Sequence, residues 1–390
     1  MSCEYAFWLS VLLIAYTYFL YPLLLFCTYT VAQIKSDWRY INNRQNRRPS
    51  SLTTAELPRV TVVIPAYNEQ ASLSAKLQNL ADLDYPGDKL EVIFVSDGSI
   101  DATNDILNKV WSPNVNKLFL PRRMGKCVAL NEAFQRASGS VVILSDATTL
   151  FASDAISKLV RHFADPGVGV VSGSLRFEGT SESKRTEGVY WRYESMLRLM
   201  EARLGATLTA SGAIYAVRKE CKEPLAPDAL IEDFVVPMTA RRHGYSVLYD
   251  PEAIATEFAA ASVTGEFRRR VRIAMGSFKN LLRFLRTPLS GFTAVAFFSH
   301  KLLRWMVPFL LIVAFVSNSL MLRRPLYPAL FIGQCLFYIW AFLGFVFHER
   351  MQRVRFVLLP YFLFSMNLAF LLGFLRVVFG RTQATWEQAR

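Results

Sequence analysis

Long apolar segments lie at both ends of the chain, and the middle alternates short apolar runs with amphipathic stretches. The N-terminal residues from Phe7 to Ile34 are apolar and carry no charge. Three more apolar stretches follow near the C-terminus: Trp305–Leu322, Leu326–Phe347 and Phe356–Leu375. A helix that crosses the hydrocarbon core of a bilayer needs about 20 such residues. The pattern therefore predicts four membrane-spanning helices.

The middle of the chain, from Pro58 to about Ala261, has the pattern of an α/β domain. Short runs rich in β-branched residues predict strands, and the stretches between them have helical spacing. Because strand and helix alternate, we expect a mostly parallel, Rossmann-like sheet with right-handed crossovers. The expected strands are 59–65, 89–97, 115–121 and 140–146, and the expected helices are 72–83, 101–110 and 126–137.

Together these patterns predict six segments along the chain. They are an N-terminal transmembrane helix (1–34), a basic linker (35–57), the α/β domain (58–261), an amphipathic interface region (262–292), C-terminal transmembrane helices (293–380) and a tail (381–390).

The positive charge of the chain, +13 at neutral pH, lies partly beside the apolar segments. Five basic residues follow the first of these segments, and the positive-inside rule places them in the cytoplasm and the N-terminus outside. Such residues also match anionic lipid headgroups. These residues are Lys35, Arg39, Arg44, Arg47 and Arg48.

The sequence gives little support for nucleic-acid binding, for zinc or disulfide sites, or for a cleaved signal peptide. Nucleic-acid binding would suit a basic chain, but no RNA- or DNA-binding motif is present. The five cysteines have no paired spacing, which argues against zinc and disulfides. The first segment begins MSCEYAFW without a basic region and is long, so we expect a retained helix, not a cleaved signal peptide.

Polar residues follow the expected strands at the points where these strands end. Tyr67 and Glu69 follow the first, Asp97 the second, Lys126 the third and Asp146 the fourth. Ligands of open α/β sheets bind at this edge. Acids there can bond a base and ribose or hold a divalent cation, and a lysine beside a helix N-terminus can face phosphates. Each residue alone has an ordinary explanation, such as a turn, but together they predict a ligand site.

The motifs PAYNE (65–69), SDGS (96–99), GKCVALNEA (125–133) and SDAT (145–148) occur in the order of a known family. The chain resembles inverting family 2 glycosyltransferases with a GT-A domain, including the membrane-embedded cellulose, chitin, hyaluronan and poly-N-acetylglucosamine synthases. This resemblance implies that Tyr67 and Glu69 contact the nucleotide base, that Asp97 lies in the nucleotide pocket, and that Lys126 approaches the diphosphate.

The same resemblance implies a divalent cation, Mg²⁺ or Mn²⁺, at Asp146. This residue matches the first acid of the family's Asp-x-Asp motif, whereas Thr148 stands at the third position. A hydroxyl is a poorer ligand than a carboxylate for a hard cation. The cation then rests on Asp146, diphosphate oxygens and water, or binds more weakly.

Two further segments resemble the acceptor side of the family. TASGAIYAVR (209–218) places Ser211 and Gly212 at the matching positions, although a bulged strand would also explain it. LIEDFVVP (230–237) resembles a Thr-Glu-Asp motif, with Glu232 and Asp233 retained. The resemblance makes Asp233 the base that takes the proton of the acceptor hydroxyl. Without it, an Asp at a helix start is more often a cap.

Residues 266–285 are rich in cations and resemble the region of the family's Gln-x-x-Arg-Trp motif. Arg272 keeps the arginine and is expected to contact the diphosphate, whereas Arg269 and Ile273 replace the glutamine and the tryptophan. In the polymer-making relatives that tryptophan stacks on the acceptor sugar. Residues 266–285 and 189–205 also have the pattern of amphipathic helices on the cytoplasmic membrane face. In the second stretch the expected apolar contacts are Tyr190, Trp191, Met196, Leu197 and Leu204.

The C-terminal end of the chain poses a topological problem. With the N-terminus outside, three further spans would put the tail outside, although its basic residues suit the cytoplasm. Either Phe356–Leu375 is broken, with Pro360 as the break, or the number of spans differs. His300, Lys301 and Arg304 are expected at the cytoplasmic mouth, lining an acceptor path or snorkelling.

The leading hypothesis is a multi-pass glycosyltransferase of the cell (inner) membrane with a cytoplasmic catalytic domain. It would transfer sugar from a nucleotide diphosphate-sugar, expected to be a UDP-sugar, to a growing glycan such as an exopolysaccharide. Its partners would be donor, acceptor and membrane lipids, with accessory secretion subunits as further candidates. Two alternatives stay open: a lipid acceptor, such as a polyprenyl phosphate or a ceramide, and a non-catalytic nucleotide-sugar-binding component of a secretion complex.

Overall fold

A single eight-stranded sheet forms the centre of the middle domain. The structure is a computed structural model that describes residues 2–43, 56–178, 184–258, 263–347 and 355–380. The strands lie in the order β3-β2-β1-β4-β7-β6-β8-β5. They are β1 (Val60–Ala66), β2 (Leu90–Asp97), β3 (Val115–Leu120), β4 (Val141–Ser145), β5 (Leu150–Phe151), β6 (Val168–Glu178), β7 (Ile214–Arg218) and β8 (Ser246–Phe258).

The first half of this sheet is parallel, as the sequence predicts. Strand β1 pairs in parallel with both β2 and β4, and β2 pairs in parallel with β3. Strand β7 is antiparallel to β4 and β6, whereas β6 and β8 are parallel. The predicted α/β, mostly parallel sheet is therefore confirmed, and its second half adds antiparallel strands.

Helices cover both faces of the sheet, because its strands are apolar on both sides. Along β1, Val63 packs into one hydrophobic core and Val62 and Ile64 pack into another, as alternation along a strand requires. The helices of this domain are α3 (Gln70–Ala81), α4 (Thr103–Lys109), α5 (Lys126–Arg136), α6 (Ala155–Val160), α7 (Lys184–Arg203) and α8 (Glu232–Arg242), with short 3₁₀ turns at Gly87–Lys89, Arg161–Ala164 and Lys219–Cys221.

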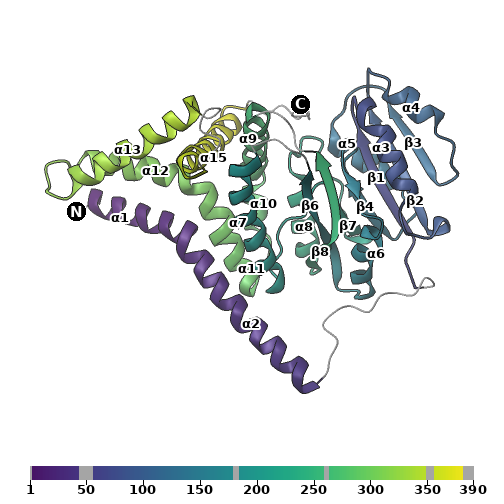
Figure 1. Ribbon diagram of the computed structural model, residues 1–390, viewed down its shortest axis with the longest axis horizontal. Helices are drawn as coiled ribbons and strands as arrows, with labels where there is room; N and C mark the ends of the chain where they lie inside the picture. The colour runs from purple at the N-terminus through teal and green to yellow at the C-terminus, as the bar shows by residue number, and fades with distance from the viewer. Residues whose placement is uncertain (1, 44–55, 179–183, 259–262, 348–354, 381–390) are drawn as a thin grey trace.

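Within the described residues, four helical stretches are long and apolar enough to cross a membrane: Ser2–Asn42, Gly291–Ser319, Tyr327–Val346 and Pro360–Val378. These match the predicted number. In Figure 1 they form the left part of the molecule, and the sheet lies on the right. They comprise α1 (Ser2–Ala15), a π-helical turn (Tyr16–Leu20), α2 (Tyr21–Asn43), α11 (Gly291–Ala296), a second π-helical turn (Phe297–Leu302), α12 (Leu303–Ser319), α13 (Tyr327–Val346) and α15 (Arg355–Val378).

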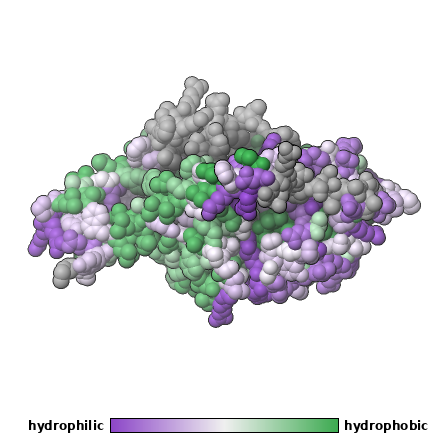
Figure 2. Space-filling view, turned by 90° about the horizontal axis from the view of Figure 1, so that it is seen from below, coloured by the Kyte–Doolittle hydropathy of each residue, from purple (hydrophilic) through white to green (hydrophobic). Residues whose placement is uncertain are grey.

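The surface has the division that a membrane-bound chain requires. Apolar side chains dominate the face over the spanning helices, and polar side chains dominate the face over the sheet (Figure 2). Trp340 and Phe342 of α13 and Leu9 and Leu12 of α1 are among the exposed apolar residues. An exposed apolar surface of this extent fits contact with lipid.

Helix α15 corrects one of the sequence-based explanations for the C-terminal topology. It continues through Pro360 from Arg355 to Val378, so Pro360 does not break it. The freed backbone carbonyl of such a helix can be satisfied by local adjustment and by neighbouring helices. The tail after residue 380 lies outside the described residues, and its side of the membrane stays a prediction.

Two helices join the sheet to the spanning helices, as the amphipathic pattern predicts. They are α9 (Val263–Lys279) and α10 (Leu281–Leu285), which lie between the two parts in Figure 1. Phe278 of α9 contacts the rings of Trp305, Phe370 and Phe374. On α7, Leu197 is buried and Leu204 packs beside Tyr21 of α2. The side chains of Tyr190 and Trp191 lie outside the described residues.

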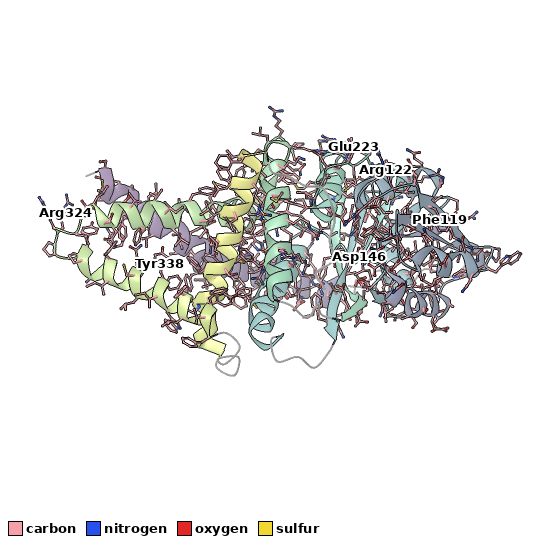
Figure 3. The ribbon with its side chains drawn as sticks, turned by 90° about the horizontal axis from the view of Figure 1, so that it is seen from above. Phe119, Arg122, Asp146, Glu223, Arg324 and Tyr338 are labelled. Carbon is pink, nitrogen blue, oxygen red and sulfur yellow. The ribbon has the colours of Figure 1, made fainter. Side chains whose placement is uncertain are left out.

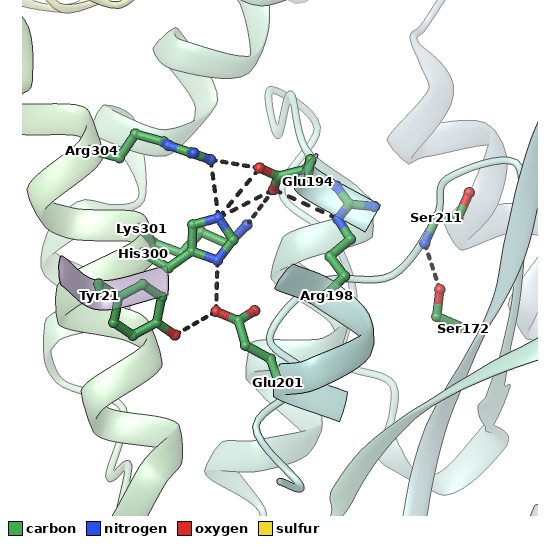
Figure 4. A network of polar contacts seen from close by, with 9 residues as sticks. All are labelled: Tyr21, Ser172, Glu194, Arg198, Glu201, Ser211, His300, Lys301 and Arg304. Carbon is green, nitrogen blue, oxygen red and sulfur yellow. Dashed lines mark hydrogen bonds and ion pairs between the residues drawn. The ribbon is translucent and has the colours of Figure 1, made fainter. Parts of the chain in front are cut away.

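A buried set of charged side chains, called here the interface cluster, ties α7 to the first two spanning helices (Figure 4). The hydroxyl of Tyr21 donates to Glu201 Oε1 at 2.7 Å, and His300 Nδ1 lies 2.7 Å from the same oxygen. Arg304 Nη1 donates to Glu194 Oε2 at 2.6 Å. Glu194, Glu201, His300 and Arg304 are all buried.

The interface cluster corrects the expectation that His300, Lys301 and Arg304 snorkel toward the membrane surface. Their side chains instead face the acids of α7, where they are 2%, 13% and 9% exposed. Buried charges need partners of opposite sign, and Glu194 and Glu201 supply these partners. The cluster therefore fixes the position of α7 against the spanning helices.

We predict that Gly139→Ala destabilises the domain, whereas the matched Gly87→Ala does not. A Cβ at residue 139 would lie 2.6 Å from the backbone nitrogen of Thr61 in β1, whereas a Cβ at residue 87 would meet only Asn114 Nδ2 at 3.8 Å. Overpacking of this kind costs about 1–3 kcal/mol. Thermal unfolding of the purified proteins should show a melting temperature several degrees lower for Gly139→Ala alone. Equal melting temperatures would contradict the prediction.

Candidate functional site

Lys126 joins the end of a central strand to the start of α8. Its Nζ lies 2.7 Å from Asp146 Oδ1 and 2.6 Å from Glu232 Oε1. Asp146 follows β4, Lys126 begins α5 and Glu232 begins α8, so three segments that are distant in sequence meet at this ammonium group. The structure thus brings together three residues of the predicted site. In Figure 3, Asp146 lies on the side of the domain that faces α9, far from Phe119.

The carboxylates of these two acids keep the side chain of Lys126 protonated. Burial by itself lowers the pKa of this ammonium group, but the carboxylates of Asp146 and Glu232 outweigh that effect and raise the pKa of Lys126. The side chain is therefore a permanent cation at neutral pH. A fixed cation beside a strand end is suited to bind the oxygens of a phosphate group.

Asp233 is a partly buried carboxyl with a raised pKa. Burial and the neighbouring charge of Glu232 raise its pKa from 3.8 to about 6, against the opposing charges of Lys126, Arg198 and Arg269. A carboxylate with such a pKa can accept a proton near neutral pH. The role of Asp233 as the base stays a prediction.

The predicted acceptor segment lies directly against Asp233. The amide of Ala210 donates to the backbone oxygen of Asp233 at 2.8 Å, and the amide of Ser211 donates to Ser172 Oγ at 2.9 Å. A Cβ on Gly212 would lie 3.7 Å from Asp233 Oδ2 and 3.8 Å from Glu232 Oε1. Gly212 therefore leaves the space beside the carboxylate of Asp233 free of its own side chain.

Asp97 lies at the end of β2, at the sheet edge where the sequence predicts a ligand site. Its carboxylate accepts hydrogen bonds from the loop before α5. Met124 N donates to Asp97 Oδ1 at 2.6 Å and Gly125 N donates to Asp97 Oδ2 at 2.8 Å. The side chain is buried. Gly125 has φ of 98°, a conformation that favours glycine. Asp97 thus shapes the turn that leads into Lys126.

Tyr67 and Glu69 lie at the end of β1, beside residues that the sequence analysis did not select. The guanidinium carbon of Arg123 lies 3.9 Å from the centre of the Tyr67 ring. Glu69 is buried and accepts a hydrogen bond from Ser72 Oγ at 3.1 Å. A ring covered by a guanidinium group offers a stacked pair of flat surfaces. Arg123 could have been found from its place beside the Gly-Lys motif.

Arg272 approaches the same acids from α9. Burial lowers its pKa, whereas the charges of Glu232, Asp146 and Asp233 raise it. The charge of Arg272 therefore interacts with those of all three acids. Its Nε is buried and has no hydrogen-bond partner among the described residues. Helix α9 thus adds a second cation to the site that Lys126 occupies.

The sequence analysis missed Glu257, which lies beside the segment after β4. Thr148 Oγ1 donates a hydrogen bond to Glu257 Oε1 at 2.8 Å. Burial raises the pKa of Glu257, and the charge of Asp146 raises it further. Glu257 belongs to no motif that the sequence analysis used, and it follows Thr148 by 109 residues. Only the pairing of β5 with β8 brings the two together.

A second missed residue, Lys76 of α3, supports the same segment from inside the domain. Its Nζ donates to Ser145 Oγ at 2.8 Å and to the backbone oxygen of Thr149 at 2.5 Å, and it lies 4.3 Å from the centre of the Phe151 ring. Burial lowers its pKa to about 7, although the charge of Asp146 opposes this shift. Lys76 therefore anchors the Ser145–Phe151 segment.

The residues at this position fit a divalent cation that also has ligands from a bound molecule. Among the described residues, no group of three His, Cys, Asp or Glu side chains could hold a metal ion. Asp146 and Glu257 nevertheless both border the segment of Thr148, since Asp146 precedes it by two residues and Glu257 accepts its hydrogen bond. Carboxylate oxygens suit Mg²⁺ and Mn²⁺.

Comparison with known proteins identifies the domain. Residues 61–221 match the model of the family described as glycosyl transferase family 2. These residues contain β1 to β7 together with Tyr67, Glu69, Asp97, Lys126 and Asp146. The sequence-based resemblance to this family is thereby confirmed for the domain.

Two curated relatives have similar sequences. The N-acetylglucosaminyltransferase of Rhizobium sp. (strain N33) is 32% identical over 247 residues, which are 59% of this chain and 55% of that protein. The poly-beta-1,6-N-acetyl-D-glucosamine synthase of Staphylococcus aureus (strain COL) is 29% identical over 253 residues, 63% of this chain and 60% of that protein. The chain therefore spans little more than half the length of these relatives.

A solved structure confirms the GT-A architecture. The mannosyltransferase PcManGT from Pyrobaculum calidifontis, in complex with GDP-Man and Mn²⁺, aligns with a TM-score of 0.68 and 23% sequence identity. The alignment covers 92% of this chain and 98% of that one. At this identity the likeness concerns the fold, including the helices that accompany the domain.

We predict that Asp97→Asn loosens the loop at Arg122 and Arg123. An amide side chain offers one acceptor oxygen, so one of the two backbone N–H groups of Met124 and Gly125 would lose its partner. Limited trypsin digestion should then cut after Arg122 or Arg123 faster than in the unmodified chain. Asp105→Asn, an exposed change on α4, is the control and should not alter the rate. Equal cleavage rates in all three proteins would contradict the role of Asp97.

Proposed function

We propose that this chain, whose residues 61–221 are a glycosyl transferase family 2 domain, is a membrane-bound inverting glycosyltransferase. Its donor is a UDP-sugar, with UDP-N-acetylglucosamine as the first candidate because both curated relatives carry that sugar in their names. Its acceptor is a growing glycan. The observation that carries the proposal is the partly buried Asp233, whose pKa is raised to about 6, beside Gly212 and next in the chain to Glu232, which binds Lys126.

Asp233 is the general base in this proposal. It takes the proton from an acceptor hydroxyl while the oxygen of that hydroxyl attacks the anomeric carbon of the donor. The bond between that carbon and the diphosphate oxygen breaks at the same time, so the electron pair leaves with the nucleoside diphosphate. Attack opposite to the leaving group inverts the anomeric configuration. Gly212 supports this role, because it approaches the carboxylate of Asp233 without a side chain of its own.

The leaving nucleoside diphosphate gains negative charge, which requires cations nearby. Lys126 and Arg272 are the protein groups that supply them in this proposal, since both lie among the acids of the site. A divalent cation, when bound at Asp146, would add further positive charge beside the diphosphate oxygens. Tyr67, Arg123 and Glu69 hold the nucleotide base at the neighbouring strand end, and Asp97 shapes the loop between base and diphosphate.

The acceptor side of the proposal comprises Ser211, Gly212 and Glu232. Glu232 binds Lys126 and adjoins Asp233 in the chain, so it links the diphosphate cation to the base. The helices that could span a membrane support a reaction at the inner membrane surface, with the domain in the cytoplasm and lipids around the spanning helices. Accessory secretion subunits would then receive the product.

A lipid acceptor is the second candidate, and one residue favours it. Ile273 of α9 is 37% exposed and stands where polymer-making relatives are expected to have an acceptor-stacking tryptophan. An aliphatic side chain offers a sugar ring less stacking surface than an indole. Product size separates the two candidates, because a lipid acceptor would carry one sugar and a glycan acceptor would become a polymer.

We predict that Asp233→Asn lowers kcat by roughly 100-fold or more, the usual contribution of general base catalysis. Purified full-length protein with radiolabelled UDP-N-acetylglucosamine and Mn²⁺ is the assay. Asp154→Asn, at a partly exposed ion pair with Lys158 on α6, is the matched control and should retain full turnover. Unchanged product formation by Asp233→Asn would favour a non-catalytic nucleotide-sugar-binding component instead.

The pH dependence of turnover follows from the pKa of Asp233. The carboxylate form accepts the proton, so kcat should be level above pH 6 and should fall as the pH decreases through about 6. An unperturbed carboxyl would keep kcat level down to its ordinary pKa of 3.8. A profile at saturating donor that stays level to pH 4 would exclude Asp233 as the base.

A further inference from the structure

We propose that Glu257 supplies a second carboxylate to the divalent cation of this site, and that Thr148 is the residue that positions it. The cation site then has two acids, Asp146 from the SDAT segment after β4 and Glu257 from the end of β8. This inference rests on the proposed function, because the cation binds together with the diphosphate of the donor.

The topology of the sheet builds this pairing. Strand β5 follows the SDAT segment and is antiparallel to β8, with Leu150 opposite Thr256 and Phe151 opposite Ala255. Glu257 is the next residue of β8, and Thr148 precedes β5 by two positions. The register therefore places residue 257 beside the segment that contains Asp146 and Thr148.

The hydrogen bond from Thr148 fixes Glu257 in that position. Thr148 Oγ1 donates to Glu257 Oε1 at 2.8 Å, which leaves Glu257 Oε2 and lone pairs of Oε1 for other ligands. A hydroxyl that donates to a carboxylate orients it, as hydrogen-bonded neighbours of metal ligands commonly do. Thr148 stands where the family's motif has its second acid, and it positions the carboxylate of Glu257 to take the place of that acid.

Two carboxylates border the same segment at this end of the sheet. Asp146 follows β4, and Thr148, two residues later, donates the hydrogen bond that holds Glu257 there. Two carboxylates that repel each other in a partly buried site gain from a shared divalent cation. The exposed side chain of Asp146, at 25%, remains reachable from solvent.

Arg272 gives independent evidence that a ligand rich in oxygen belongs at the same position. Its buried Nε has no hydrogen-bond partner among the described residues, and its charge interacts with those of Glu232, Asp146 and Asp233. A diphosphate would supply the acceptor that this N–H group needs. The same diphosphate would supply the remaining oxygen ligands of a cation held by Asp146 and Glu257.

The test measures Mn²⁺ binding directly. The full chain, purified in detergent, is titrated with Mn²⁺ in the presence of UDP, and free Mn²⁺ is followed by electron paramagnetic resonance. We expect Glu257→Gln to weaken Mn²⁺ binding by about 10-fold or more and Thr148→Val to weaken it by less. Glu252→Gln, on the same strand but paired with Arg161, is the matched control and should bind as the unmodified chain does.

A rescue variant separates metal binding from folding. Thr148→Asp combined with Glu257→Gln puts a carboxylate back at residue 148, next to the amide at residue 257, and should recover most of the Mn²⁺ affinity. Melting temperatures of all variants accompany the titrations. A purely structural contact would give Glu257→Gln a lower melting temperature, unchanged Mn²⁺ affinity and no effect of the rescue, and this result would overturn the inference.

The two proposals fail in different ways. If the unmodified chain binds Mn²⁺ with UDP and Glu257→Gln binds it equally well, only the role of Glu257 is wrong. If the unmodified chain binds no Mn²⁺ in the presence of UDP, the donor site of the proposed function is wrong, and the inference falls with it.

Discussion

The ammonium group of Lys126 is the contact on which the arrangement of the site depends. It binds Asp146 after β4 and Glu232 at the start of α8, so one cation holds together the donor and acceptor halves of the proposed site. The Lys126 side chain is only 14% exposed, and a charge so far removed from water needs partners of opposite sign. The three segments are therefore fixed relative to one another, and Asp233 is fixed with them, because it follows Glu232 directly.

A second buried set of charges connects this site to the spanning helices. Arg198 Nε of α7 lies 3.8 Å from Glu194 Oε1. The charge of Arg198 also lowers the pKa of Asp233, whereas burial and Glu232 raise it. Glu194 in turn binds His300 and Arg304 in the interface cluster (Figure 4). The charge environment of the proposed base thus includes a helix that the spanning helices hold in place.

Local patterns made most of the fold predictable. Strands such as β1 and β4 consist of β-branched residues buried on both faces, so their ends, and with them Glu69 and Asp146, could be found from sequence. The family resemblance added Asp233 and Arg272, which composition alone would have left as a helix cap and a surface cation. The ordered helix through Pro360 was not predictable, because its stability depends on neighbouring helices.

The missed residues act across long sequence separations. Glu257 reaches the site through the β5–β8 register, and Lys76 reaches the same segment from inside α3; no periodicity in either stretch indicates this. His300 and Arg304 looked like residues of a membrane surface, because their acidic partners on α7 lie about 100 residues earlier in the chain. The carboxylate of Asp97 accepts hydrogen bonds from the loop before Lys126, a contact that the sequence did not indicate, and its place in a nucleotide pocket stays a prediction.

The most direct test of a single site built around Lys126 is an experimental structure of the full chain with UDP and Mn²⁺. The account predicts that the diphosphate contacts Lys126 and Arg272, that Mn²⁺ binds Asp146 and Glu257, and that the base lies beside Tyr67. It also predicts that Asp233 faces the β-phosphate across the space at Gly212. A nucleotide bound elsewhere on the domain, or a diphosphate that touches neither Lys126 nor Arg272, would contradict the account.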